Sequence, residues 1–272
     1  MKRTQSRRRW ILYAVHLIIT AIIVFPLLFG LVSSFRPLED IFKYVSPVTW
    51  KTFFPHHFSF DAYVNLFAER GFDRILLNTF FVTAVSVVFG LAVGSMAAFA
   101  FSMFKFPGRN FLFVIVLLTF MIPFEVIAIP LYKLVNSFGW IDSYYGLIVP
   151  GVANGLVIFL YRQFFMEIPH SLVESARVDG ASWPRIYAGI IMPLSKAVSV
   201  SGSLLIFIQQ WESFMWPLIA TRSKEYRMLQ VALSDFVTEA GTYWNELFAA
   251  ALISVIVPIV VLLPLQRYFV KG

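Results

Sequence analysis

The sequence predicts an all-α membrane protein with six transmembrane helices. Of its 272 residues, 59% are hydrophobic and 14% are charged, and the mean hydropathy is +0.76. Soluble domains carry about 25% charged residues, so this composition argues against a water-soluble fold. The chain also contains six apolar runs, each near the roughly 20 residues that a helix needs to cross a bilayer. Backbone groups in lipid must be satisfied within the segment, so we expect each run to be helical.

The six expected spans are residues 10–33, 75–103, 111–132, 144–161, 197–220 and 247–266. The second span carries small residues at spacings of three or four, namely Gly90, Gly94, Ala97 and Ala98. Small residues so spaced let another helix approach closely, which predicts a packing face. The Pro-Gly turn "FPGRN" at 106–110 separates the second span from the third.

The third span carries a carboxylate at membrane depth. Glu125 stands between Pro123 and Pro130, and proline removes a backbone donor and bends a membrane helix. A charged group at this depth must face protein or water rather than lipid. We therefore expect Glu125 in the wall of a cavity.

The fifth span combines polar and aromatic residues, which are Gln209, Gln210, Trp211, Glu212 and Trp216. This combination suits a sugar, because hydroxyl groups need hydrogen-bond partners and flat sugar faces stack on rings. The tryptophans have an alternative role as anchors at the membrane interface. Glu212 is expected to face the same cavity as Glu125, or else to form an interhelical hydrogen bond.

The distribution of Lys and Arg predicts the orientation. Of the 22, thirteen lie at the two termini, in the 104–110 turn and in the segment 162–196, and nine lie in the longer loops of the other side. Both termini are therefore expected in the cytoplasm, with residues 1–9 as a cytoplasmic N-terminal segment. The net charge of +7 is concentrated beside the membrane faces, which favours anionic lipid over nucleic acid as its partner.

The chain has no cysteine, so disulfides, thiol nucleophiles and cysteine metal sites are excluded. Its four histidines, His16, His56, His57 and His170, are not at metal-ligand spacing, and we expect no metal site.

A polar loop, residues 167–196, interrupts the otherwise apolar chain. Pro169 is tolerated in a first helical turn, and Gly180 stands where a helix can end with positive φ. Ser182 can then cap a second helix that has Pro184 in its first turn. The loop is therefore expected to form a helix, a turn and a helix on the cytoplasmic face.

The first of these helices has a small apolar face of Leu172, Val173 and Ala176. It also carries Glu174 and Asp179, which anionic lipid would repel. Asp179 opposes the helix dipole, so we expect it to cap the next helix or to bind a partner. Docking in the groove of another protein is favoured over lying in the lipid headgroups.

The polar loop resembles the cytoplasmic loop of the membrane subunits of bacterial ATP-binding-cassette (ABC) importers, whose pattern is E-A-A, three residues, G, nine residues, I-x-L-P. The matching residues are Glu174, Ser175, Ala176, Gly180, Ile190, Met192 and Pro193, with Ser for the second Ala and Met for Leu. The stretches "LLNTFFVT", "MIPFEVIAIPLY", "YRQFFMEIP" and "QRYFVKG" resemble the second permease of carbohydrate importers of the maltose and glycerol-phosphate type.

This resemblance implies a type I ABC importer transmembrane domain over residues 10–272, in the bacterial inner membrane, with residues 167–196 as a coupling loop. The implied partners are a second permease, expected to be a different chain, two ATPase subunits and an extracytoplasmic solute-binding protein. The residues implied in contact with the ATPase are Glu174, Ser175, Ala176, Asp179, Gly180 and Ala181.

The resemblance also implies that ATP and magnesium are bound by the ATPases. The chain contains no G-x-x-x-x-G-K-[ST] phosphate loop, so we expect it to hold no cofactor and not to be an enzyme. The implied solute is a sugar, a polyol or an oligosaccharide. The alternatives are an ion-coupled secondary transporter that uses Glu125 and Glu212 as proton relays, and a membrane scaffold. A secondary transporter has no need for an ATPase dock. A scaffold would leave the cluster of Pro, Glu and Gln residues in the spans without a purpose.

Overall fold

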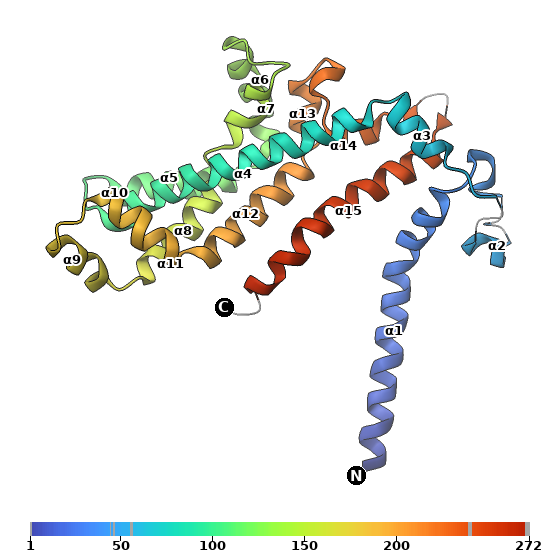
Figure 1. Ribbon diagram of the computed structural model, residues 1–272, viewed down its shortest axis with the longest axis horizontal. Coiled ribbons are helices and arrows are strands. Elements are labelled where there is room, and N and C mark those ends of the chain that lie inside the picture. Colours follow the sequence, from blue (N-terminus) through green and yellow to red (C-terminus); the bar gives the residue numbers. More distant parts are fainter. Residues whose placement is uncertain (1, 44, 46, 55–56, 239–240, 270–272) are drawn as a thin grey trace. The chain divides into compact units, whose positions relative to one another are not determined.

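Helices make up nearly all the regular structure of the computed structural model, which describes residues 2–43, 45, 47–54, 57–238 and 241–269. The only strands among these residues are the paired β1 (Val237–Thr238) and β2 (Gly241–Thr242). The chain forms two compact units, Met1–Asp73 with Leu233–Val257, and Arg74–Ala232 with Pro258–Gly272. Their elements can be followed in Figure 1.

The first unit contains α1 (Lys2–Ser33), η1 (Leu38–Asp40), α2 (Trp50–Phe53), α3 (Asp61–Ala68) and the beginning of α15 (Trp244–Phe269). An ion pair lies inside it, because Arg70 Nε is 2.9 Å from Oε2 of the buried Glu246. The Arg70 guanidinium also lies over the Tyr243 ring, 4.8 Å from its centroid. These contacts tie the end of α3 to the start of α15.

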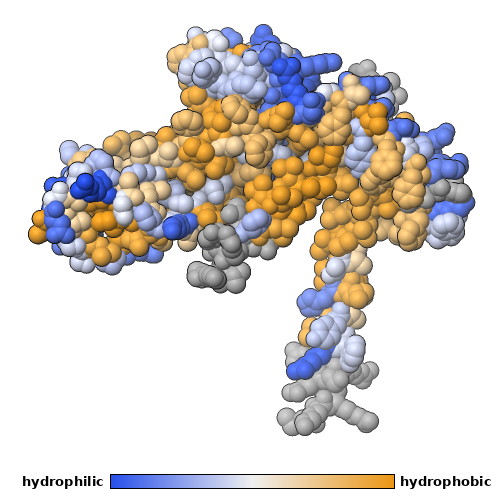
Figure 2. Space-filling view, viewed as in Figure 1, coloured by the Kyte–Doolittle hydropathy of each residue, from blue (hydrophilic) through white to orange (hydrophobic). Residues whose placement is uncertain are grey.

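The second unit contains α4 (Phe72–Met103), α5 (Arg109–Met121), α6 (Phe124–Ser137), α7 (Tyr144–Ile148), η2 (Val149–Gly151), α8 (Gly155–Glu167), α9 (His170–Val178), α10 (Trp183–Ile186), the π-helical η3 (Tyr187–Ile191), α11 (Met192–Leu194), α12 (Lys196–Trp211), α13 (Met215–Ala220), η4 (Lys224–Tyr226) and α14 (Leu229–Ser234). Hydrophilic side chains gather at the end with α9 and α10 and around α6 and α13, with hydrophobic side chains between (Figure 2).

The predicted all-α membrane fold is confirmed. Within the described residues, three helices are long and apolar enough to cross a bilayer, namely Arg9–Ser33 within α1, Phe72–Met103, and Trp244–Pro264 within α15. Three bent helix pairs bring the number to six if each is one span: Arg109–Met121 with Phe124–Ser137, Tyr144–Gly151 with Gly155–Glu167, and Trp183–Leu194 with Lys196–Trp211.

Two of the expected spans, 111–132 and 144–161, consist of two helices each, and the bend that proline predicts in the first is present. Between α5 and α6 the chain turns by 103° at Ile122 and Pro123. Proline has no backbone N–H and favours an extended residue before it, and Ile122 has φ −77° and ψ 122°. Between α7 and α8 the bend is 40°, and Asn154 begins the new helix as its N-cap.

The expected helix over 197–220 also ends early, at Trp211. The carbonyl oxygen of Trp211 accepts a hydrogen bond from Gln230 Nε2 at 3.3 Å, which satisfies one backbone group at the helix end. The chain resumes as α13 only at Met215.

The predicted small-residue face of α4 is confirmed. A methyl group placed on Gly90 would lie 2.7 Å from Ile206 Cδ1 of α12, and one on Gly94 would lie 2.9 Å from Val157 Cγ1 of α8. Both distances are shorter than side chains tolerate, so glycine lets α4 approach the other two helices. The core that these helices enclose contains Val157, Tyr161, Phe165, Ile186, Ile191 and Ile206.

Candidate functional site

The polar loop contains a regular helix stop at Gly180. Gly180 has φ +81°, in the left-handed region that favours glycine. Its N–H donates to the Arg177 carbonyl oxygen at 3.1 Å, and the Ala181 N–H donates to that of Ala176 at 2.9 Å. This pair of bonds is the Schellman motif, with Asp179 as C-cap of α9. The predicted helix end with positive φ is therefore confirmed.

The loop is held against the end of α4 by aromatic packing. The Trp183 ring lies 4.8 Å from the Phe104 ring and 6.2 Å from the Phe99 ring. The Arg177 guanidinium lies 5.0 Å from the Trp183 centroid, and it donates to the Ala181 carbonyl oxygen at 2.9 Å. The turn is thus linked to a membrane-spanning helix.

The expected apolar face of α9 is divided by the structure. Val173 is buried, and Ala176 is half-buried against the same core, so this side of α9 packs on the chain itself. Leu172 and Val178 face outward with 44% and 87% of their surface exposed, and Ser175 lies between them on the helix. We call Leu172, Ser175 and Val178 the outer face of α9.

The other expectations for the loop are met in part. Ser182 occupies the N-cap of α10 and Pro184 lies in its first turn, but the Ser182 side chain makes no capping hydrogen bond. The Asp179 side chain is exposed and makes no hydrogen bond with the described residues, so it does not cap α10. Glu174 is exposed beside the outer face.

The helix break before α8 brings two amides together. Asn154 Oδ1 accepts from the N–H groups of Leu156 at 3.1 Å and Val157 at 3.2 Å, and Asn154 Nδ2 donates to Gln209 Oε1 at 2.9 Å. Gln209 is exposed. Its neighbour Gln210 is turned inward, because its Nε2 donates to Ser86 Oγ of α4 at 2.8 Å. The two predicted pathway glutamines therefore occupy different environments.

The two tryptophans of the fifth span are buried by the chain itself. Trp211 stacks on Phe207 with centroids 5.7 Å apart. Trp216 Nε1 donates to the Gly146 carbonyl oxygen at 3.0 Å, and its ring meets the edge of Phe124 at 6.1 Å. The chain itself therefore packs around both rings, and their contact with a sugar or with the membrane interface stays a prediction.

The two membrane carboxylates are exposed. Glu125 lies in the first turn of α6, and Glu212 is the C-cap of α12. Neither side chain forms a hydrogen bond or an ion pair with the described residues. That the two face a common cavity stays a prediction.

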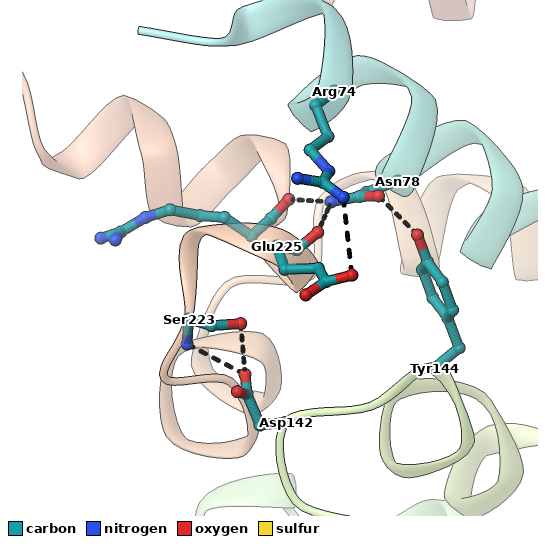
Figure 3. A network of polar contacts seen from close by, with 7 residues as sticks. Arg74, Asn78, Asp142, Tyr144, Ser223 and Glu225 are labelled. Atoms are coloured by element: carbon teal, nitrogen blue, oxygen red, sulfur yellow. Dashed lines mark hydrogen bonds and ion pairs between the residues drawn. The ribbon is translucent and has the colours of Figure 1, made fainter.

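A polar network that the sequence did not predict joins three segments (Figure 3). Asn78 Nδ2 donates to the carbonyl oxygens of Glu225 at 2.7 Å and Arg227 at 3.1 Å, and Tyr144 OH donates to Asn78 Oδ1 at 2.7 Å. Arg74 pairs with the Glu225 carboxylate at 3.5 Å. The start of α4, the start of α7 and the η4 segment are thereby held together.

Asp142, just before α7, makes further contacts with the segment that leads into η4. It adopts φ +60°, which Asp tolerates better than most side chains. Its Oδ1 accepts from the N–H groups of Arg222 at 2.9 Å and Ser223 at 3.0 Å, and from Ser223 Oγ at 3.1 Å. Burial alone would raise the pKa of Asp142, but these donors outweigh it and lower the pKa below its ordinary value.

Among the described residues no three His, Asp or Glu side chains are grouped as metal ligands. His56 and residues 270–272 lie outside the described residues, so the structure says nothing of that histidine or of the end of "QRYFVKG".

Comparison with known proteins identifies the family. Residues 90–272 match the binding-protein-dependent transport system inner membrane component family. The sn-glycerol-3-phosphate transport system permease protein UgpE of Rhizobium meliloti is 34% identical over 255 residues, which are 92% of this chain and 90% of the relative. The arabinooligosaccharides transport system permease protein AraQ of Halalkalibacterium halodurans is 29% identical over 272 residues, 100% of this chain and 96% of the relative.

A solved structure shows the same architecture. It is the crystal structure of a bacterial ABC transporter involved in the import of the acidic polysaccharide alginate. One of its chains matches with a TM-score of 0.84 and 25% identity, over 97% of this chain and 98% of that one. The polar loop, the type I importer fold and these matches agree, and the chain belongs to the binding-protein-dependent transport system inner membrane component family, as a membrane permease of an ABC importer that is not itself an enzyme.

Proposed function

We propose that this chain is the second permease of an ATP-driven importer for a sugar, a polyol or an oligosaccharide. It would work with a permease of different sequence, two ATPase subunits that bind ATP and magnesium, and an extracytoplasmic solute-binding protein. The names of the relatives, glycerol phosphate and arabinooligosaccharide permeases, support the solute class. The outer face of α9, two exposed apolar side chains on a polar loop, is the observation that carries the proposal.

The outer face of α9 suits the groove of an ATPase. Leu172 and Val178 would be buried there, and Glu174 and Asp179 would meet polar groups at the rim. The other proposed contacts, Ser175, Ala176, Gly180 and Ala181, form the rest of the helix end. Because Trp183 packs on Phe99 and Phe104, a displacement of docked α9 would be passed to α4.

The proposed orientation places both termini and the polar loop in the cytoplasm, with the basic turn at 104–110 beside anionic lipid. Glu125, Gln209 and Glu212 would face the solute pathway. A secondary transporter that uses the two exposed carboxylates as proton relays is the alternative. It leaves the outer face of α9 without a role.

Site-specific cross-linking tests the dock. The chain has no cysteine, so Val178→Cys gives a single thiol for a benzophenone maleimide. In the complete importer we expect Val178→Cys and Leu172→Cys to cross-link to the ATPase. Val173→Cys is the matched control, because Val173 is buried on the inner side of the same helix. Cross-linking of the two outward positions to lipid alone, in a complex that contains the ATPase, would contradict the proposal.

A further inference from the structure

Asn154 and Gln209 meet at the same depth in the two helices that flank the polar loop. Helix α8 ends at Glu167 before the loop, and α12 begins at Lys196 after it. Each amide lies thirteen residues from the loop end of its helix, about 20 Å at roughly 1.5 Å per residue. The hydrocarbon layer is about 30 Å thick, so the pair lies within it.

The hydrogen bonds fix which groups of the pair remain free. Two backbone N–H groups point at Asn154 Oδ1, so the other atom of that amide must be the Nδ2 donor. Nδ2 donates to Gln209, and the accepting atom must therefore be Oε1. This leaves the two N–H donors of Gln209 Nε2 with no acceptor among the described residues.

Glu212 stands three residues beyond Gln209, on the same side of the end of α12. Side chains at this spacing lie about 5 to 6 Å apart at Cβ. An exposed donor and an exposed carboxylate therefore lie side by side at membrane depth. Such groups do not face lipid, and they require either water and solute or another protein chain.

From this arrangement we infer that Asn154, Gln209 and Glu212 form a hydroxyl-binding array that admits a neutral saccharide in preference to a phosphorylated one. A hydroxyl group both accepts and donates, so it can accept from Gln209 Nε2 and donate to the Glu212 carboxylate. A phosphate only accepts and is anionic, so Glu212 repels it. Asn154 acts by holding the Gln209 amide in the donating orientation.

No cation lies beside Glu212 on its own helix, and the one basic residue of α8, Arg162, lies over the Phe113 ring, 4.0 Å from its centroid. Beyond Lys196, α12 has no Lys or Arg, and α13 has none. The exposed Glu125 adds a second carboxylate in the adjoining span. The inference rests on the proposed importer function and departs from the solute named for the glycerol phosphate relatives.

The first test measures the solute class. Cells that lack other sugar importers and express the complete importer are given labelled maltose, arabinotriose or sn-glycerol 3-phosphate. We expect uptake of at least one neutral probe and none of the phosphorylated one. Uptake of glycerol 3-phosphate alone, or of none of the probes, would overturn the inference.

The second test uses variants of the array. Gln209→Ala and Glu212→Gln should each lower uptake of the neutral probe about tenfold, while the amount of assembled complex stays unchanged. Gln163→Ala is the matched control, because Gln163 is an exposed glutamine of α8 outside the array. A loss of assembled complex in step with uptake would assign these residues to contact with the second permease instead. If the α9 positions do not cross-link to the ATPase but the uptake tests give the expected results, the proposed dock is contradicted and the array is not.

Discussion

The N–H group of Ala181 donates to the carbonyl oxygen of Ala176 at 2.9 Å across the left-handed Gly180. No atom lies within 4 Å of a methyl group placed on Gly180, so space does not require glycine at this position. The positive φ requires glycine, because residues with a side chain disfavour this region. The glycine of the family pattern is therefore a backbone requirement of the turn that ends α9.

Gly180→Ala should weaken the turn by about 1 to 2 kcal/mol and lower the ATP hydrolysis that the solute-binding protein stimulates. Gly180→Asn should be milder, since Asn tolerates this region better. Gly189→Ala is the control, because Gly189 has equally open surroundings and no positive φ. Limited proteolysis of the loop and ATPase assays of the purified importer measure both effects. Equal behaviour of Gly180→Ala and Gly189→Ala would show that φ is not the reason for glycine.

Asp142 should make the stability of its contacts with Arg222 and Ser223 depend on pH. Its pKa is lowered in the fold from an ordinary value of 3.8, so the charged form is stabilised by folding. This contribution is present above the unfolded pKa and is lost as the pH falls through the lower folded value. Asp142→Asn tolerates the same φ but lacks the charge.

We therefore expect Asp142→Asn to unfold at a lower temperature than the wild type at pH 7, and the difference to shrink below pH of about 4. Melting followed by tryptophan fluorescence in detergent at several pH values measures it. The other carboxylates titrate in both proteins, so the difference isolates Asp142. A difference that is the same at every pH would assign the effect to hydrogen-bond geometry alone.

The sequence predicts those features of the structure that depend on residues close together in the chain. Gly180 was predicted from the helix that it ends, and Gly90 and Gly94 from their spacing. Pro123 and Pro130 predict a bend in the third span, but neither its angle of 103° nor the end of α12 at Trp211 follows from the sequence, because both lie inside apolar runs. Hydropathy measures length and polarity, and it does not show where the backbone changes direction.

Contacts between distant segments could not be predicted from one sequence. The side-chain amide of Asn78 donates to the backbone carbonyl of Glu225, 147 residues away. A backbone acceptor leaves no sign in the residue type. The inward position of Trp211 and Trp216 has the same origin, since burial by neighbouring helices depends on how those helices pack. The amide pair of Asn154 and Gln209 likewise appears only once α8 and α12 are placed side by side.

Trp216 offers a test that separates packing from contact with a sugar. Its indole N–H donates to the Gly146 carbonyl oxygen at 3.0 Å, and its ring is buried among Val82, Leu147 and Met228. Trp216→Phe keeps an aromatic face but leaves the buried carbonyl without this donor, at a cost of about 1 to 3 kcal/mol. We expect the melting temperature of the complex to fall and the uptake per folded complex to stay normal. Trp10→Phe is the control, since Trp10 is 71% exposed and should tolerate the change. If Trp216 instead stacks on the solute, Trp216→Phe should leave melting unchanged, and Trp216→Leu should abolish uptake from a stable complex. Thermal melting and uptake, measured on both Trp216 variants, therefore decide whether the ring packs within the chain or stacks on the solute.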